Sequence, residues 1–236
     1  MKTKISNSFI DDSAEVAKSI MAVTHPHLVD SFSTVIRFLA LNPEMAPDFS
    51  KRKTPPLFGQ REYIQECANK FASGRVPKLP KKSQTVPDEM VSVVLHLAFG
   101  VPQEHLDAIK SGHRDSMTAE NIVGDLLERY IARSLESKEW VWVSGSLIKA
   151  VDFIRPPTVE DPLWHALQIK NRDNSENSSS RAIRNGTDIE EWHRTFSKKT
   201  GSNWDRFPDT YAQGEFTEDG FREFVTAHLL DLRKII

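Results

Sequence analysis

Carboxylates and a lysine follow one another between residues 124 and 170 in an order that suits phosphodiester hydrolysis. Glu128 comes first, in a helical apolar pattern, and Asp152 lies inside the short apolar run 150–154. Lys170 closes a second apolar run, two residues after Gln168. Carboxylates hold divalent cations in such reactions, and a nearby lysine can orient the attacking water or offset charge developing on phosphorus. The irregularity is Gln168, which stands where a second acid is expected.

Each of these side chains also has an ordinary structural role open to it. Asp152 can cap a turn or pair with Arg155. Lys170 can face solvent at a strand end, and Glu128 can form a surface ion pair with a neighbouring arginine or lysine. The order of the residues favours the cation-site hypothesis, because the interval from Asp152 to Gln168 fits a strand end, a loop and a return strand.

The composition is that of an ordinary globular chain. The 236 residues, with 39% hydrophobic and 27% charged side chains, fit one large domain or a domain with an appended subdomain. The longest apolar runs, such as 90–99, are too short for a bilayer, and the first residues lack a signal-peptide core. The single cysteine, Cys67, excludes an intramolecular disulfide and a cysteine-based zinc cluster. We therefore expect a cytoplasmic protein that has no membrane partner.

The charge is distributed unevenly, although the net charge is only −2. Residues 51–82 contain nine basic and two acidic side chains. Such a patch can neutralise phosphates, and it can equally be a solvated loop.

Apolar periodicity and breaker residues predict an α/β (α+β) fold with a helical N-terminal region. Helices are expected over about 13–21, 28–41, 61–71, 88–99, 102–112 and 118–135. Three short runs rich in β-branched and aromatic residues predict strands at 140–144, 148–154 and 164–170, with Gly145 and Ser146 turning the first into the second. Helices are expected again at about 187–199 and 217–236. This order divides the chain into a helical region, 1–112, for gripping DNA or for dimerisation, and a catalytic core, 113–236.

A polar run directly after Lys170 suits contact with DNA. Arginine pairs with guanine, asparagine with adenine, and serine with phosphate. The alternative is an ordinary surface loop in which these residues form turns and make no contact with DNA. The aromatic segments 192–194 and 203–206 are expected to hold this loop by packing. The candidate DNA-binding residues are Asn171, Arg172, Asn174, Ser175, Asn177, Ser178, Ser179, Ser180, Arg181, Arg184 and Asn185.

The order of these residues resembles the PD-(D/E)XK nuclease superfamily, whose core is a helix, a mixed sheet and flanking helices. The resemblance implies a catalytic set of Glu128, Asp152, Gln168 and Lys170. It also implies Mg²⁺ held by Asp152 and Glu128, with the Ile169 carbonyl assisting. The chain departs from the pattern in two ways: no proline precedes Asp152, and Gln168 replaces an acid. A glutamine carbonyl can still face a hard cation, but one negative charge is lost.

A closer resemblance is to SinI-type type II restriction endonucleases. It rests on residues 119–132, 149–154 and 168–180 and covers at least 85–205. It implies double-strand cleavage at GGWCC by a homodimer and, functionally, a cognate DNA methyltransferase. A twofold-symmetric target suits a dimer that has one active site for each strand.

Two further hypotheses stay open beside a site-specific endonuclease. One is a repair or junction nuclease on the same core that reads the shape of DNA or damage in it. The other is a DNA-binding module with a degenerate nuclease site. The replacement of an acid by Gln168 is the feature that supports this hypothesis.

Overall fold

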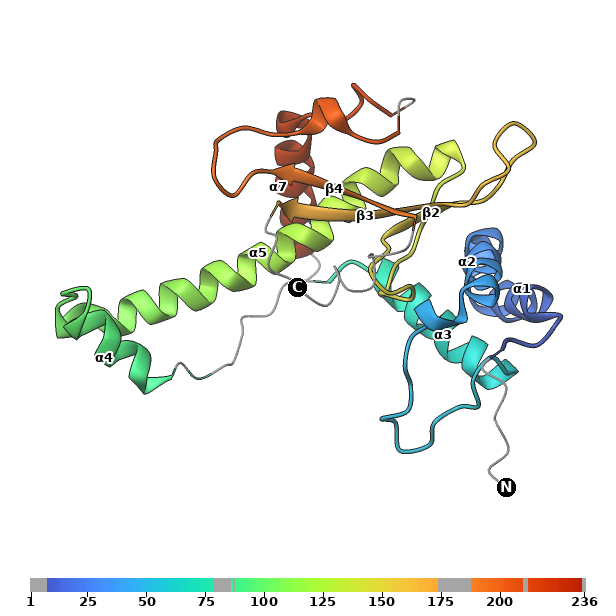
Figure 1. Ribbon diagram of the computed structural model, residues 1–236, viewed down its shortest axis with the longest axis horizontal. Coiled ribbons are helices and arrows are strands. Elements are labelled where there is room, and N and C mark those ends of the chain that lie inside the picture. The colour runs from blue at the N-terminus through green and yellow to red at the C-terminus, as the bar shows by residue number, and fades with distance from the viewer. Residues whose placement is uncertain (1–7, 79–85, 87, 174–187, 210–211, 235–236) are drawn as a thin grey trace.

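The computed structural model describes residues 8–78, 86, 88–173, 188–209 and 212–234, and it has the mixed α+β fold that the sequence predicts. Three helices gather at one end of the molecule (Figure 1). They are α1 (Ser13–Thr24), α2 (Val29–Leu41) and α3 (Arg61–Arg75), and they confirm the expected N-terminal helices.

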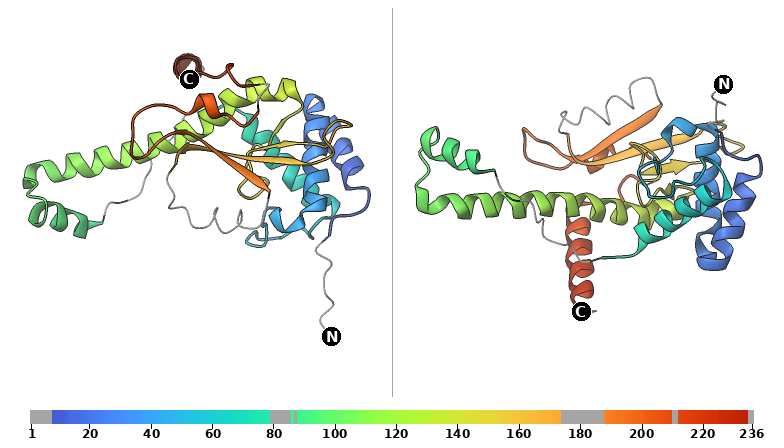
Figure 2. Two further views of the ribbon diagram at one scale, coloured as in Figure 1. Left: turned by 45° about the horizontal axis from the view of Figure 1, so that its top comes forward. Right: turned by 90° about the horizontal axis from the view of Figure 1, so that it is seen from below.

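A helical arm projects from the opposite end (Figures 1 and 2). It consists of α4 (Glu89–Leu97) and the first part of α5 (Leu106–Leu135). The Asp88 side chain caps α4 by accepting a hydrogen bond from the Met90 N–H at 2.9 Å. Gly100 follows the helix with φ +68°, a conformation that glycine adopts without strain.

The expected division of α5 into two helices, 102–112 and 118–135, is wrong. The helix continues through this stretch because it contains no proline and its polar residues bond within the helix. Lys110 pairs with Asp107 at 3.1 Å, and the Thr118 hydroxyl donates to the Arg114 carbonyl at 2.9 Å instead of capping a new helix. The domain boundary expected after residue 112 therefore falls inside one continuous helix.

A four-stranded sheet lies beside the C-terminal part of α5. Its strands, in spatial and sequence order, are β1 (Val141–Trp142), β2 (Phe153–Arg155), β3 (His165–Arg172) and β4 (Ile189–Thr195). β1 and β2 are antiparallel, as are β2 and β3, whereas β3 and β4 are parallel. The strands expected at 140–144, 148–154 and 164–170 are present, the first two in shortened form.

The segment predicted as a helix at 187–199 is instead the strand β4. Ile189 packs toward the N-terminal helices, whereas Trp192 is buried in the core against α5. Two residues that are three apart share one face of a helix but lie on opposite faces of a strand. Burial of Ile189 and Trp192 on opposite sides of the sheet therefore requires the extended form.

The sheet separates two apolar cores. Ile154 and Ala166 face the core made with α1, α2 and α3. Phe153, Leu167 and Ile169 face the core made with α5. Alternate residues of the central strands are thus buried on opposite sides, which holds the strands rigidly between two helical layers.

The last helix, α7 (Glu218–Lys234), confirms the predicted C-terminal helix and packs against α5. Phe221 and Leu232 of its apolar face are buried, and Ile236 lies outside the described residues. None of the helices in the described part of the chain combines the length and apolarity that crossing a bilayer demands.

Candidate active site

Asp152 lies immediately before β2, and its N–H donates a hydrogen bond to the Leu167 carbonyl of β3 at 2.9 Å. Its backbone carbonyl already accepts a hydrogen bond from the Val143 N–H at 2.8 Å. Its carboxylate Oδ2 accepts the Ile169 N–H at 2.7 Å, in the place of a ladder carbonyl. Arg155, the alternative partner, pairs with Asp161 at 2.8 Å. Asp152 is therefore fixed at the sheet by the backbone of β3.

Glu128 approaches the same place from α5. The Trp142 indole N–H donates to its Oε2 at 3.0 Å. Arg129, a candidate partner for Glu128, pairs with Asp125 at 2.7 Å instead. Leu127 and Ile131 anchor this part of α5 in the core, so the helix holds Glu128 toward the sheet.

Glu128 and Asp152 lie close enough together that ionisation of both carboxyl groups at once is strongly disfavoured. Burial raises the pKa of Glu128 to about 8, with a further increase from the charge of Asp152. Burial also raises the pKa of Asp152 to about 6, although the Ile169 N–H and the charge of Lys170 favour its ionised form. The pair therefore shares one proton near neutral pH.

Lys170 lies on β3 beside Asp152 and on the same strand face as Gln168. Its side chain is 18% exposed, and its Nζ forms an ion pair with Glu191 Oε2 at 2.7 Å. Gln168 is buried at 8% exposure. Lys170 is thus not a solvent-facing strand-end lysine. The sequence prediction did not include Glu191, because its segment was expected to be a helix.

A divalent cation fits the chemistry of this place. Two partly buried carboxylates repel each other, and a cation would relieve that repulsion. Gln168 and the Ile169 backbone add carbonyl oxygens nearby. Mg²⁺ commonly uses only one or two carboxylates and completes its shell with water. Within the described ranges, no three His, Cys, Asp or Glu side chains converge closely enough to form a full protein cage.

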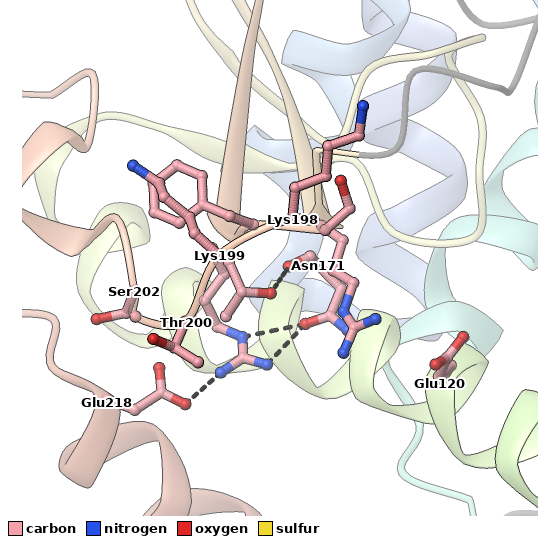
Figure 3. Close-up of a pocket in the computed structure, with 13 residues that line it drawn as sticks. Glu120, Asn171, Lys198, Lys199, Thr200, Ser202 and Glu218 are labelled. Carbon is pink, nitrogen blue, oxygen red and sulfur yellow. Dashed lines mark hydrogen bonds and ion pairs between the residues drawn. The ribbon is translucent and has the colours of Figure 1, made fainter.

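A hollow of about 730 Å³ opens at the ends of β3 and β4, and Asn171, the residue after Lys170, lies in its lining. Arg172, Lys198 and Lys199 contribute positive charge to its lining. Figure 3 shows Asn171 and Glu218 joined through one guanidinium. This group belongs to Arg194, which donates from Nε and Nη2 to Asn171 Oδ1 at 3.0 and 2.8 Å and also pairs with Glu218.

Of the expected DNA-binding residues, the structure describes Asn171 and Arg172, and both line this hollow. The Asn171 side chain is bonded to Arg194, so it also holds β3 to β4. The other nine lie outside the described residues: Asn174, Ser175, Asn177, Ser178, Ser179, Ser180, Arg181, Arg184 and Asn185.

The tryptophans of the aromatic segments 192–194 and 203–206 pack inside the protein, whereas most of the loop that they were expected to hold lies outside the described residues. Trp192 and Trp204 are 3% and 6% exposed, and their ring centroids lie 5.0 Å apart. Trp192 also donates from Nε1 to the Asn203 carbonyl at 3.2 Å. These contacts support the strand ends that border the hollow.

Comparison with known proteins identifies the family. The model for the SinI restriction endonuclease family matches residues 13–231. The chain belongs to the SinI restriction endonuclease family. It is 45% identical to the type II restriction enzyme SinI of Salmonella infantis over 225 residues, covering 95% of this chain and 97% of the relative. It is 44% identical to the type II restriction enzyme Eco47I of Escherichia coli, with the same coverage of both chains.

Membership of the SinI family decides among the three functional hypotheses. The chain is a type II restriction endonuclease, a site-specific deoxyribonuclease that acts on DNA. The repair nuclease and the degenerate DNA-binding module are therefore not needed to explain the site.

Proposed function

We propose that this restriction endonuclease hydrolyses DNA with Mg²⁺ at a PD-(D/E)XK-like site formed by Glu128, Asp152, Gln168 and Lys170. One observation carries the proposal. Asp152, bonded to the backbone of β3, interacts electrostatically with both Glu128 and Lys170. Two carboxyl groups held close together away from water, with a lysine ammonium group beside them, are typical of a catalytic centre.

The side chains have separate tasks in the proposed reaction. Asp152 and Glu128 would hold the cation, and the carbonyl oxygens of Gln168 and Ile169 would be available beside them. When bound, Mg²⁺ supplies Lewis acidity that stabilises charge on the phosphate. Lys170 orients a water molecule for attack on phosphorus and donates hydrogen bonds to the negative oxygens. The water oxygen forms a bond to phosphorus as the bond from phosphorus to the departing sugar oxygen breaks. The attacking water releases a proton to solvent, and the departing oxygen takes up a proton from solvent.

The hollow lined by basic residues at the ends of β3 and β4 supports the proposal that duplex DNA approaches along these strand ends. Arg172, Lys198 and Lys199 would neutralise backbone phosphates there. Residues 171–185 would then lie next to the scissile phosphate and contact bases of a GGWCC site. An arginine contact to guanine would select the G·C pairs.

We also propose a homodimer, because cutting both strands of a symmetric target requires two equivalent sites. The exposed face of α4 supports a second copy as the partner. None of its nine residues is buried, and Val94, Leu97 and the following Phe99 are 51%, 76% and 73% exposed. Apolar side chains gathered on a projecting arm suit an interface between identical chains.

The cellular setting follows from the proposed reaction. The enzyme would act in the cytoplasm, where the DNA that it cuts is found. A methyltransferase that modifies the same sequence would protect the DNA of the cell.

Incubation of plasmid DNA of known sequence with the enzyme, in Mg²⁺ or in EDTA, tests the proposal. We expect discrete fragments that end at GGACC and GGTCC in Mg²⁺, and intact plasmid in EDTA. Cleavage in EDTA would contradict the cation requirement, and fragments with other ends would contradict the assigned sequence.

A further inference from the structure

Glu191 stands beside the site on the neighbouring strand. β3 and β4 are parallel, and their register pairs Gln168 directly with Glu191. Paired residues of adjacent strands project from the same face of a sheet. The carboxylate of Glu191 is therefore next to the position at which the superfamily pattern requires an acid and this chain has glutamine.

The contact with Lys170 ties Glu191 to the proposed catalytic group. Glu191 Oε2 lies 2.7 Å from Lys170 Nζ, and the two side chains are 30% and 18% exposed. An ion pair at this level of burial is screened less than a surface pair. The neighbouring Glu190 projects to the opposite face, because its paired residue is Leu167, which is buried against α5.

We infer that Glu191, on β4, supplies the negative charge that the cation site lacks at Gln168, acting from outside the set of direct ligands, and that it also holds Lys170 in place. This inference rests on the proposed cation site and adds a residue to it. Asp152 and Glu191 flank Gln168 on the two neighbouring strands, so a cation facing Gln168 would feel both charges. The negative charge that Gln168 removes would thus come from a residue more than 20 positions later in the sequence, without a third acid among the direct ligands.

Calorimetric titration of Mn²⁺ into the full-length chain tests this role without measuring catalysis. Glu191→Gln keeps the shape of the side chain and removes its charge. We expect it to weaken Mn²⁺ binding by about 10- to 100-fold, as losses near a metal site commonly do. The matched control, Glu190→Gln on the opposite face of β4, should bind Mn²⁺ as the wild type does.

A variant that has the acid at position 168 of β3 instead of position 191 of β4 distinguishes an effect of Glu191 on the cation from an effect on the position of Lys170 alone. We expect the double variant Gln168→Glu/Glu191→Gln to regain most of the Mn²⁺ affinity lost in Glu191→Gln. Wild-type affinity in Glu191→Gln would overturn the inference while leaving the proposed function intact. Failure of the double variant to regain affinity would also overturn it. A wild-type chain that neither binds Mn²⁺ nor cleaves DNA with a divalent cation would instead overturn the cation site itself.

Discussion

At the scale of single residues, the site combines groups that the sequence order identifies with one that it does not. Glu128, Asp152 and Lys170 could be selected because their types recur in a known order. Their partners could not be selected, since Trp142 and Glu191 become neighbours only through strand pairing. Glu191 was missed for a definite reason: a helix prediction for its segment removes the two-residue alternation that places it beside Gln168.

The raised pKa of Glu128 predicts how stability depends on pH in the absence of metal. The folded state keeps the proton up to about pH 8, whereas a glutamate in the unfolded chain loses it near its ordinary value of 4.5. Between these values the unfolded state binds fewer protons, so stability falls as pH rises. The slope is at most about 1.4 kcal/mol per pH unit for one group.

Urea denaturation in EDTA at several pH values between about 5 and 8 measures this effect. Glu128→Gln removes the ionisable group, so its free energy of unfolding should increase relative to the wild type as pH rises. A difference that does not change with pH would contradict the assigned cause. Added Mg²⁺ should reduce the wild-type loss, because the cation favours the ionised carboxylates.

At the scale of elements, the predictions succeeded where the spacing or the type of the apolar residues is typical of one kind of element. The helices α1, α2 and α3 follow their apolar periodicity, and the strand ending in Lys170 follows its β-branched and aromatic residues. The prediction failed for β4 because its buried apolar residues, Ile189 and Trp192, are three positions apart, a spacing that also fits one face of a helix. α5 failed because Gly112 and nearby small polar residues resemble a break, although helical hydrogen bonds continue through them.

The continuity of α5 can be tested at Gly112. A Cβ added there would meet no atom within 4 Å, and the backbone is helical. Gly112→Ala should therefore raise the free energy of unfolding by about 0.5–1 kcal/mol, since alanine is the better helix former.

Gly74→Ala is the matched contrast in α3. Its Cβ would lie 2.4 Å from the Gly145 backbone nitrogen, so this variant should lose stability. Thermal or urea unfolding measures both. A destabilised Gly112→Ala would indicate that the helix is broken at this position.

At the scale of the whole molecule, the structure divides its tasks along α5. The C-terminal half of this helix carries Glu128 and packs against the sheet, whereas the N-terminal half extends outward with α4 (Figure 2). Sequence reasoning identified the helices but could not show that they form a projecting arm, because projection depends on where packing stops. Between Leu106 and Leu126 the helix has no buried residue.

The arm gives a prediction for assembly. Sedimentation velocity should show a wild-type dimer, and Leu97→Glu on the α4 arm should shift it toward monomer. Leu163→Glu is the control, because Leu163 is similarly exposed, at 66%, but lies in the loop before β3. A monomeric wild type would contradict the dimer, and a dimeric Leu97→Glu would contradict the assigned surface.

The central claim is that Asp152 organises a cation-dependent hydrolytic site. Its most direct test is the single-turnover cleavage rate of a GGACC duplex in Mg²⁺ by Asp152→Asn, with Asp161→Asn as the control at a surface carboxylate. Loss of a charge that stabilises the transition state should lower the rate by about 10³-fold or more, while DNA binding in Ca²⁺ persists and the control cleaves normally. Cleavage by Asp152→Asn at the wild-type rate would contradict the account.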